Sequence, residues 1–234
     1  MALHLADHGT DVVVTYRSRE KDALDVVEAI AAKGRKAVTL PLDVTDSRSF
    51  GAFAETLRSE LGRIWQRDRL DILVNNAGTG VHASFAETTE EQFDELVSVH
   101  LKATFFLTQK LLPLVADGGR VLNVSSGLTR ITFPGYGAYA AMKGAVEVLT
   151  RYMAKELGPR RIAVNVVAPG AVETDFNGGA VRDNEHVNRL IASQTALGRV
   201  GLPDDVGAAV AMLLAPESAW ITGQRIEVSG GQSL

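Results

Sequence analysis

Tyr139 and Lys143 stand four residues apart in a stretch whose pattern predicts a long helix from about Tyr136 to Leu157. Residues at this spacing project from the same face of a helix, so the Lys143 ammonium should lie beside the Tyr139 phenol. A nearby cation favours the phenolate, and we expect it to lower the pKa of Tyr139 toward the range useful in general acid–base catalysis. Taken alone, the pair is more simply explained as an incidental tyrosine and lysine on one helix, so the context must decide.

The context begins upstream, where residues 121–124 form a buried-strand pattern that ends in the hydroxyls of Ser125 and Ser126. The loop that follows would return Ser126 to the tyrosine as a hydrogen-bond donor. Together with other motifs, this arrangement resembles the short-chain dehydrogenase/reductase family over nearly the whole chain. The matching motifs are Asn75-Asn76-Ala77-Gly78 after one strand, Ser126 thirteen positions before Tyr139, Lys143, and Pro169 to Thr174 after a later strand.

The resemblance implies reversible hydride transfer between a nicotinamide and a carbonyl or secondary alcohol. Tyr139 would be the general acid/base, and Ser126 would stabilise the charge that develops on the substrate oxygen. Lys143 would lower the tyrosine pKa and hold the nicotinamide ribose. Ser125 is the alternative serine, but the spacing favours Ser126.

Family members often place a catalytic asparagine, which anchors a water relay, at the position that His100 occupies here. Histidine can also hold a water and relay protons, and it titrates near neutrality, so we expect the activity to acquire a pH dependence. The alternative is a helix histidine with a satisfied ring nitrogen and no catalytic part.

Strand and helix patterns alternate along the chain, which predicts βαβ units and a doubly wound parallel sheet, that is, a Rossmann-like α/β/α fold. The run 11–16 is β-branched and predicts a buried parallel strand. A capping box at Thr88-x-x-Glu91 predicts the start of a helix that ends near Leu112. The predicted strands are 11–16, 36–42, 70–75, 121–124, 162–168 and 225–228, and the predicted helices are 1–9, 20–33, 46–62, 88–112, 136–157 and 203–214.

The beginning of the sequence departs from the family. The phosphate-binding glycines of this fold lie between the first strand and the first helix, and this sequence begins inside that helix. We expect the first strand and the glycine loop to be absent from this sequence because its start was assigned at an internal methionine. A true truncation or a poorly folding chain is the alternative. The strand would lie between 11–16 and 70–75, whose facing backbone edges would otherwise be unpaired.

The end of the 11–16 strand indicates which dinucleotide is bound. Tyr16 stands where folds that prefer NAD usually carry a carboxylate, and Arg17 follows it. A guanidinium suits a 2′-phosphate, so the sequence predicts NADP(H). The alternative is that Arg17 and the nearby Arg19 are solvated loop charges. By resemblance, Asp43 and Val44 border the adenine, although Asp43 is also a plausible turn or N-cap residue.

The resemblance places further cofactor contacts where two other predicted strands end. Asn75, Ala77 and Gly78 follow the 70–75 strand, where open α/β sheets bind ligands, and the asparagines alternatively stabilise the strand edges. Pro169 and Gly170 should pass the nicotinamide. Val172 and Thr174 should lie near it.

Composition predicts a single globular domain, 1–234, with 46% hydrophobic and 22% charged residues. The net charge of −4 gives no support for nucleic-acid binding, and the absence of cysteine excludes disulfides. We expect no membrane partner and a cytoplasmic location, because no apolar run or signal peptide points elsewhere. The histidine spacing predicts no metal site.

The substrate should meet residues 176–202, a polar and weakly periodic segment that predicts at most a short helix flanked by loops, together with 129–136 and 80–85. Aromatic residues that would line an apolar pocket are Phe85, Phe133, Tyr136 and Phe176. The run 195–203 resembles bacterial 3-oxoacyl-acyl-carrier-protein reductases, without fixing the small-molecule carbonyl or alcohol substrate. The resemblance implies a homotetramer or homodimer through the two long helices. The alternative function is a non-catalytic oligomerising protein that keeps the fold but has lost dinucleotide binding.

Overall fold

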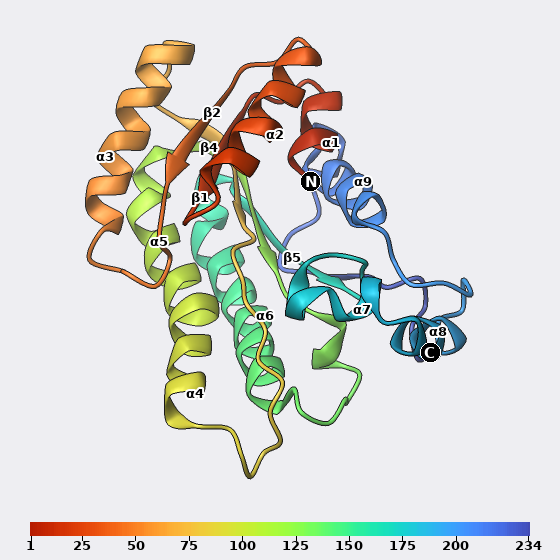
Figure 1. Ribbon diagram of the computed structural model, residues 1–234. Helices are drawn as coiled ribbons and strands as arrows, with labels where there is room; N and C mark the ends of the chain where they lie inside the picture. The colour runs from red at the N-terminus through yellow and green to blue at the C-terminus, as the bar shows by residue number, and fades with distance from the viewer.

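The computed structural model describes residues 1–234 and contains six strands and nine α-helices, several extended by short 3₁₀ or π turns (Figure 1). The strands are β1 Val12–Tyr16, β2 Ala37–Pro41, β3 Leu70–Asn75, β4 Val115–Val124, β5 Ala163–Pro169 and β6 Arg225–Val228. The helices are α1 Ala2–Asp7, α2 Glu20–Ala32, α3 Phe50–Glu60, α4 Glu90–Leu96, α5 Ala103–Leu111, α6 Gly137–Leu157, α7 Ala180–Asp183, α8 Glu185–Ser193 and α9 Pro203–Leu214. None of these helices combines the length and the apolar character needed to cross a bilayer.

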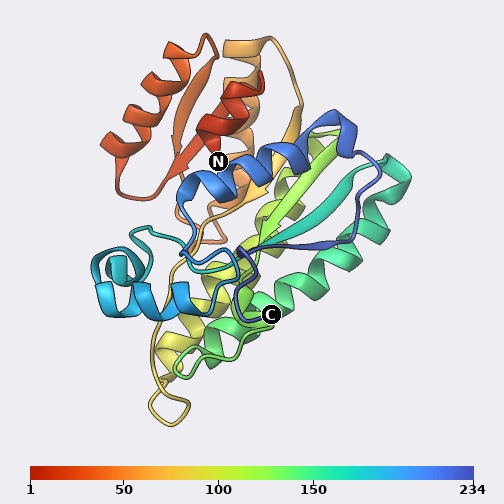
Figure 2. The same cartoon turned by 90° about the vertical axis from the view of Figure 1, so that its right-hand side faces the viewer.

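The strands pair in parallel, as predicted, but in two sheets. One sheet holds β1 and β2, and the other has the order β3-β4-β5-β6. In Figures 1 and 2 the first pair, coloured red to orange, lies beside the larger sheet. β1 and β3 share no strand hydrogen bonds, so each has one unpaired edge, as the sequence predicts for these two strands.

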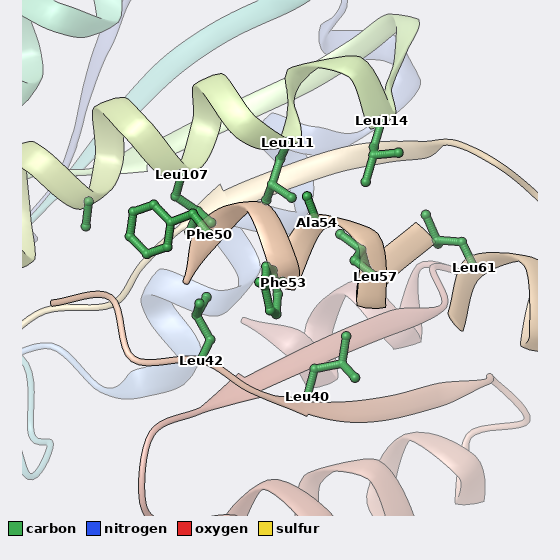
Figure 3. Close-up of a cluster of buried hydrophobic side chains, with 11 residues drawn as sticks. Leu40, Leu42, Phe50, Phe53, Ala54, Leu57, Leu61, Leu107, Leu111 and Leu114 are labelled. Carbon is green, nitrogen blue, oxygen red and sulfur yellow. The ribbon is translucent and has the colours of Figure 1, made fainter. Parts of the chain in front are cut away.

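Helices cover both faces of the strands, which confirms the doubly wound α/β fold. On one face, α3 and α5 enclose a cluster of buried side chains with Leu40 and Leu42 of the β2 segment, in which the fully buried Phe50 lies beside Leu107 (Figure 3). On the other face, α1 and α9 pack on β4 and β5 around Leu122, Val167 and Val210. α6 packs along β4 and β5, so the helix that carries Tyr139 rests on the four-stranded sheet.

Two strands of similar composition differ in burial. Six of the seven residues of β5 are buried, whereas no residue of β1 is fully buried, although both strands are rich in valine. The prediction of a buried strand at 11–16 is therefore wrong in degree. β5 lies between two strands, while β1 has a neighbour on one edge only, so helices and strands cover less of its side-chain surface.

The helix predicted over 88–112 begins one residue later than expected and runs without a break as α4, a π turn and α5. Its N-cap is Thr89, whose hydroxyl accepts from the amide of Gln92 at 3.3 Å, while the Thr88 hydroxyl donates to the carbonyl of Ser84. The helix then passes through a π turn, η2 (Val97–Lys102), before α5 begins. π turns of this kind often occur at functional sites, and this one carries His100.

Two other predicted segments also differ from the structure. α3 begins at Phe50 rather than near residue 46, because the Asp46 carboxylate accepts from the amide of Arg48 and closes a turn there. Residues 176–195 contain more helix than predicted, since Asn184 caps α8 by accepting from the amides of His186 and Val187. The periodicity of this segment was too weak to reveal two short helices.

Candidate active site

The two serines after β4 have different partners. The Ser125 hydroxyl is buried and donates to the Glu147 carboxylate of α6 at 2.7 Å. The Ser126 hydroxyl caps the short helix η4 (Gly127–Thr129) by accepting from the amide of Leu128 at 3.2 Å. The Ser126 side chain also acts to lower the pKa of Tyr139, an effect that Ser125 does not have.

Tyr139 and Lys143 lie in the first turns of α6 and are both buried, with exposures of 6% and 5%. The Lys143 ammonium lies 5.6 Å from the centre of the tyrosine ring and donates to the carbonyl of Val124 at 2.8 Å. The predicted juxtaposition of the two side chains is therefore present. Lys143 is also tied to the strand that leads into the serine loop.

The expected lowering of the tyrosine pKa is not found. Burial raises the pKa of Tyr139 to about 12, and the opposing effect of Ser126 is smaller. Burial likewise lowers the pKa of Lys143 to about 8. Removing water from both groups disfavours both charged forms, and this effect exceeds the attraction that the four-residue spacing suggests. Near neutral pH the phenol is therefore protonated, a form that can donate a proton.

His100 completes the cluster from the π turn η2. Its ring meets the Tyr139 ring edge to face, with centroids 5.3 Å apart, and its Nε2 lies 2.8 Å from the Thr79 carbonyl oxygen. Because a carbonyl only accepts, Nε2 carries the proton and Nδ1 is left as an acceptor. Nδ1 is buried and has no protein partner. A side chain on Gly78 would crowd this ring, since its Cβ would lie 3.1 Å from Cε1.

The expectation that His100 titrates near neutrality is wrong. Burial, helped by the charge of Lys143, lowers the pKa of His100 to about 4. The imidazole is therefore neutral over the physiological range. The satisfied ring nitrogen of the alternative interpretation is present, because Nε2 donates to the Thr79 carbonyl, while Nδ1 has no donor.

The residues predicted to hold the adenosine end lie where β1 and β2 end. The Arg17 guanidinium is exposed and forms no ion pair with a carboxylate, although its charge helps to lower the pKa of Asp43. Tyr16 donates to Glu20 at 2.9 Å. Asp43 accepts from the amide and the hydroxyl of Thr45 at 2.8 and 2.7 Å, which is the turn role left open for it. Val44 packs against the cluster of Figure 3.

The residues that follow β3 and β5 combine structural roles with access to the sheet edge. The Asn75 amide donates to Thr108 and Asn123 at 2.9 and 2.8 Å, so this asparagine joins β3 to α5 and β4. Ala77 and Gly78 are exposed. Gly170, after Pro169, is closely packed: a Cβ there would lie 2.8 Å from Ser229. Val172 bridges to Gly201, and the Thr174 hydroxyl accepts from the amide of Phe176 at 3.3 Å.

These observations fit a nicotinamide dinucleotide at two points. Arg17 is an exposed cation without a carboxylate partner directly after β1, where it can bind an anionic group. An ammonium has three donors, and Lys143 uses one of them on Val124, which leaves two for ribose hydroxyls.

Several aromatic rings lie near Tyr139. Phe176 lies 5.6 Å from Tyr139 between ring centres, Tyr136 lies 6.5 Å from it, and Phe133 lies 6.3 Å from Tyr136. The fourth predicted pocket residue, Phe85, is fully exposed and makes no ring contact with this group.

Two residues of this group were not singled out as pocket residues from the sequence. His82 packs edge-on against Tyr136 at 5.0 Å, and the Asn177 amide donates to the Tyr136 hydroxyl at 3.0 Å. Asn177 has a left-handed backbone (φ 52°). The adjacent Gly178-Gly179 pair was the available signal for such a turn.

Comparison with known proteins places this chain in a family. A family profile described as enoyl-(acyl carrier protein) reductase matches residues 1–233. A hydroxynaphthalene reductase-like protein, Arp2, of Metarhizium brunneum is 37% identical over 99% of this chain and 88% of its own length. The chain belongs to the short-chain dehydrogenase/reductase family.

Two similar proteins of known structure share the fold and are both reductases of ketones. The reductase LugOII, which catalyses keto-reduction at C1 during lugdunomycin biosynthesis, is 40% identical, with a TM-score of 0.93 over 100% of this chain and 92% of its own. The angucycline C-6 ketoreductase LanV with bound NADP is 35% identical, with a TM-score of 0.91 over 98% of this chain and 90% of its own. The protein is thus similar to ketone reductases of the same Rossmann fold.

Proposed function

We propose that the protein is an NADP(H)-dependent reductase that converts a ketone to a secondary alcohol, with Tyr139 as the proton donor. The observation that carries the proposal is the buried meeting of Tyr139, Lys143 and the Ser126 loop beside His100. A helix that served packing alone would have no use for a lysine this deeply buried, since burying an ammonium is costly.

In the reaction, NADPH supplies the hydride. Tyr139, protonated because its pKa is raised to about 12, donates its proton to the carbonyl oxygen. Ser126 donates a hydrogen bond to the same oxygen and stabilises the charge that develops there. Arg17 binds the 2′-phosphate, and Lys143 holds the nicotinamide ribose. The unpartnered Nδ1 of His100 accepts a hydrogen bond from a water that links the site to solvent.

We infer that the ketone is carried by a fused aromatic ring system. Support comes from the rings of Tyr136 and Phe176, which flank Tyr139 and offer faces and edges for stacking. It also comes from relatives whose names specify hydroxynaphthalene or an angucycline, and from LanV, whose structure has been solved with NADP and rabelomycin.

The first test is melting of the protein alone, with NADPH and with NADH. At a hundred times its Kd, a nucleotide adds about 2.7 kcal/mol to the free energy of unfolding. We expect NADPH to raise the melting midpoint more than NADH does. If neither nucleotide raises it, the non-catalytic oligomerising protein becomes the better interpretation.

The second test is turnover. We expect NADPH oxidation with 1-tetralone, a fused-ring aromatic ketone, at a higher kcat/KM than with cyclohexanone. Equal values would argue against recognition by the aromatic rings, and no turnover with any ketone despite NADPH binding would argue against the reductase.

A further inference from the structure

A polar cluster lies behind the Ser126 loop, and the proposed reaction uses none of its charged groups. At its centre is Glu147, one turn beyond Lys143 on α6, with a side chain that is 14% exposed. Its Oε1 atom accepts from the hydroxyls of Ser125 and Thr129 at 2.7 and 2.8 Å and from Nε of Arg225 at 2.8 Å. One carboxylate oxygen therefore joins the serine loop, the catalytic helix and β6.

Arg225 holds the carboxylate in place. Its remaining nitrogens donate to Glu227 at 2.9 Å, to the Thr129 hydroxyl at 3.2 Å and to the Ser126 main-chain carbonyl at 3.5 Å. Glu227 in turn binds Arg130, at the far end of the serine loop, at 2.6 and 2.9 Å. Chiefly through this contact with Arg130, the pKa of Glu227 is lowered to about 2, so Glu227 stays ionised over the working pH range.

Glu147 contacts the chain on both sides of Ser126. Ser125 precedes Ser126, and Thr129 follows it by three residues. The Thr129 hydroxyl oxygen also lies 2.9 Å from the Ser126 carbonyl oxygen, which is the alternative acceptor for its single hydrogen. Glu147 stands on the same rigid helix as Tyr139, two turns further along. Glu147 therefore joins the loop that carries Ser126 to the helix that carries Tyr139.

We propose that Glu147, held by Arg225, is the positioning residue for Ser126: it fixes the serine loop against the helix that carries Tyr139. The proposal rests on the proposed function, because Ser126 acts there on the substrate oxygen. A displacement of about 1 Å in a reacting group can lower a rate by roughly a hundredfold. Stability alone gives a weak reason for such a network, since well-packed apolar residues often replace buried ion pairs without loss.

The test is a double-mutant cycle with Glu147→Gln and Ser126→Ala. Glutamine keeps the shape of the side chain but removes the charge that pairs with Arg225. In the wild-type background we expect Glu147→Gln to lower kcat about ten- to hundredfold while the KM for NADPH stays within about twofold. In the Ser126→Ala background we expect no further loss, because the group being positioned is already gone. If the reductions in kcat caused by the two single substitutions multiply in the double variant, the proposal is wrong.

A second readout does not require turnover. The NMR signal of the ζ-carbon of Tyr139, observed with labelled tyrosine, reports the hydrogen bond to its hydroxyl. Glu147→Gln and Ser126→Ala should shift this signal in the same direction, and the double variant should shift it no further. An unchanged signal in Glu147→Gln contradicts the proposal even if the protein reduces no ketone, so the two proposals fail separately.

The matched control is Glu156→Gln, on the same helix but exposed and without an ion pair, which should change neither readout. If Glu147→Gln does not fold, Ser125→Ala combined with Thr129→Val removes the two loop contacts and leaves the Glu147–Arg225 pair intact. This pair of substitutions should give the same loss of kcat and the same lack of additivity with Ser126→Ala. A normal kcat in that variant would show that the loop needs no such anchor.

Discussion

The two-stranded sheet and the four-stranded sheet are built from similar sequences and differ in what surrounds them. β5 has a strand on both edges and is almost completely buried, while β1 has one on a single edge and is half-buried. The proposed catalytic groups lie against the four-stranded sheet, whereas Arg17, which we propose binds the 2′-phosphate, follows the last residue of β1. The proposed chemistry therefore belongs to the more buried sheet, and the proposed choice between NADPH and NADH belongs to the less buried one.

The electrostatics of the two regions differ in the same way. Around Tyr139, burial is the main influence on the pKa values. It raises the pKa of Tyr139 and lowers those of Lys143 and His100, so that it favours the neutral form of each side chain. At the ends of β1 and β2 the groups are exposed, and the pKa of Asp43 is lowered mainly by hydrogen bonds from Thr45. We therefore expect substitutions in one region to leave the function of the other largely intact.

The largest expected effect is that of Tyr139→Phe. Removing the only proposed proton donor should lower kcat about a thousandfold, within the range that general acid catalysis contributes. Steady-state kinetics with 1-tetralone measures this loss. The rise in melting midpoint with NADPH should persist, because the adenosine end is bound elsewhere. Loss of that rise would show that the two regions are not separable.

The second prediction concerns acid stability and His100. Its pKa is about 4 in the folded protein against an ordinary 6.5, a difference of 2.5. Below about pH 6.5 the unfolded chain binds the proton more readily, so folding stability falls as the pH falls toward 4. One histidine with this difference lowers the free energy of unfolding by about 3 kcal/mol once the pH is below both pKa values. His100→Asn should remove this part of the acid sensitivity, as unfolding free energies at about pH 7 and about pH 4 would reveal.

The same variant tests the role of His100 in turnover. Asparagine can also hold a water, so His100→Asn should keep most of the activity near neutral pH. A collapse of kcat would mean that the imidazole itself is required. An unchanged acid limb of the stability curve would mean that the ring is less buried than its 2% exposure indicates.

The third prediction compares one substitution at two sites. Val167→Ala in β5 removes two buried methyl groups and should lower the free energy of unfolding by about 2 kcal/mol, including the cavity it leaves. Val13→Ala in half-buried β1 should cost less than half as much. Urea unfolding of both variants measures the difference. Equal costs would show that β1 is as well packed as β5 and would remove the contrast between the sheets.

Local patterns predicted much of this fold. β3, β6 and α9 begin and end at the predicted residues, because each is bounded by its own hydrophobic run or a starting proline. Thr88 and Thr89 are a different case, since each is followed three residues later by a glutamate or glutamine, and only the folded backbone distinguishes them. Neighbouring sequence did not reveal the half-buried state of β1, which depends on a strand edge and not on valine content.

The sequence predicted that Lys143 lies beside Tyr139, but it did not predict the pKa values of the two side chains. The four-residue spacing correctly brought Lys143 to Tyr139, yet the pKa of each is governed by burial, which arises from elements distant in sequence. The Glu147–Arg225 contact joins residues 78 positions apart and could not be read from either segment. Spacing identifies groups on one helix, whereas desolvation and cross-element bonds require the assembled fold.

The last prediction tests the comparison between the two regions from the side of the nucleotide. Arg17→Ala should weaken NADPH binding about ten- to hundredfold and leave NADH binding unchanged, because hydrogen bonds to a charged group contribute about 1.5–3 kcal/mol and NADH lacks the 2′-phosphate. The affinity of Arg17→Lys for NADPH should lie between those of the wild type and Arg17→Ala, since an ammonium keeps the charge but not the forked geometry. Titration calorimetry with both nucleotides gives the four affinities, with Lys21→Ala, an exposed cation on α2, as the control. Equal weakening of NADPH and NADH would mean that Arg17 supports the end of β1 rather than the phosphate. No weakening would instead shift the proposed contact to Arg19, which must then give up its ion pair with Asp175 to reach the nucleotide.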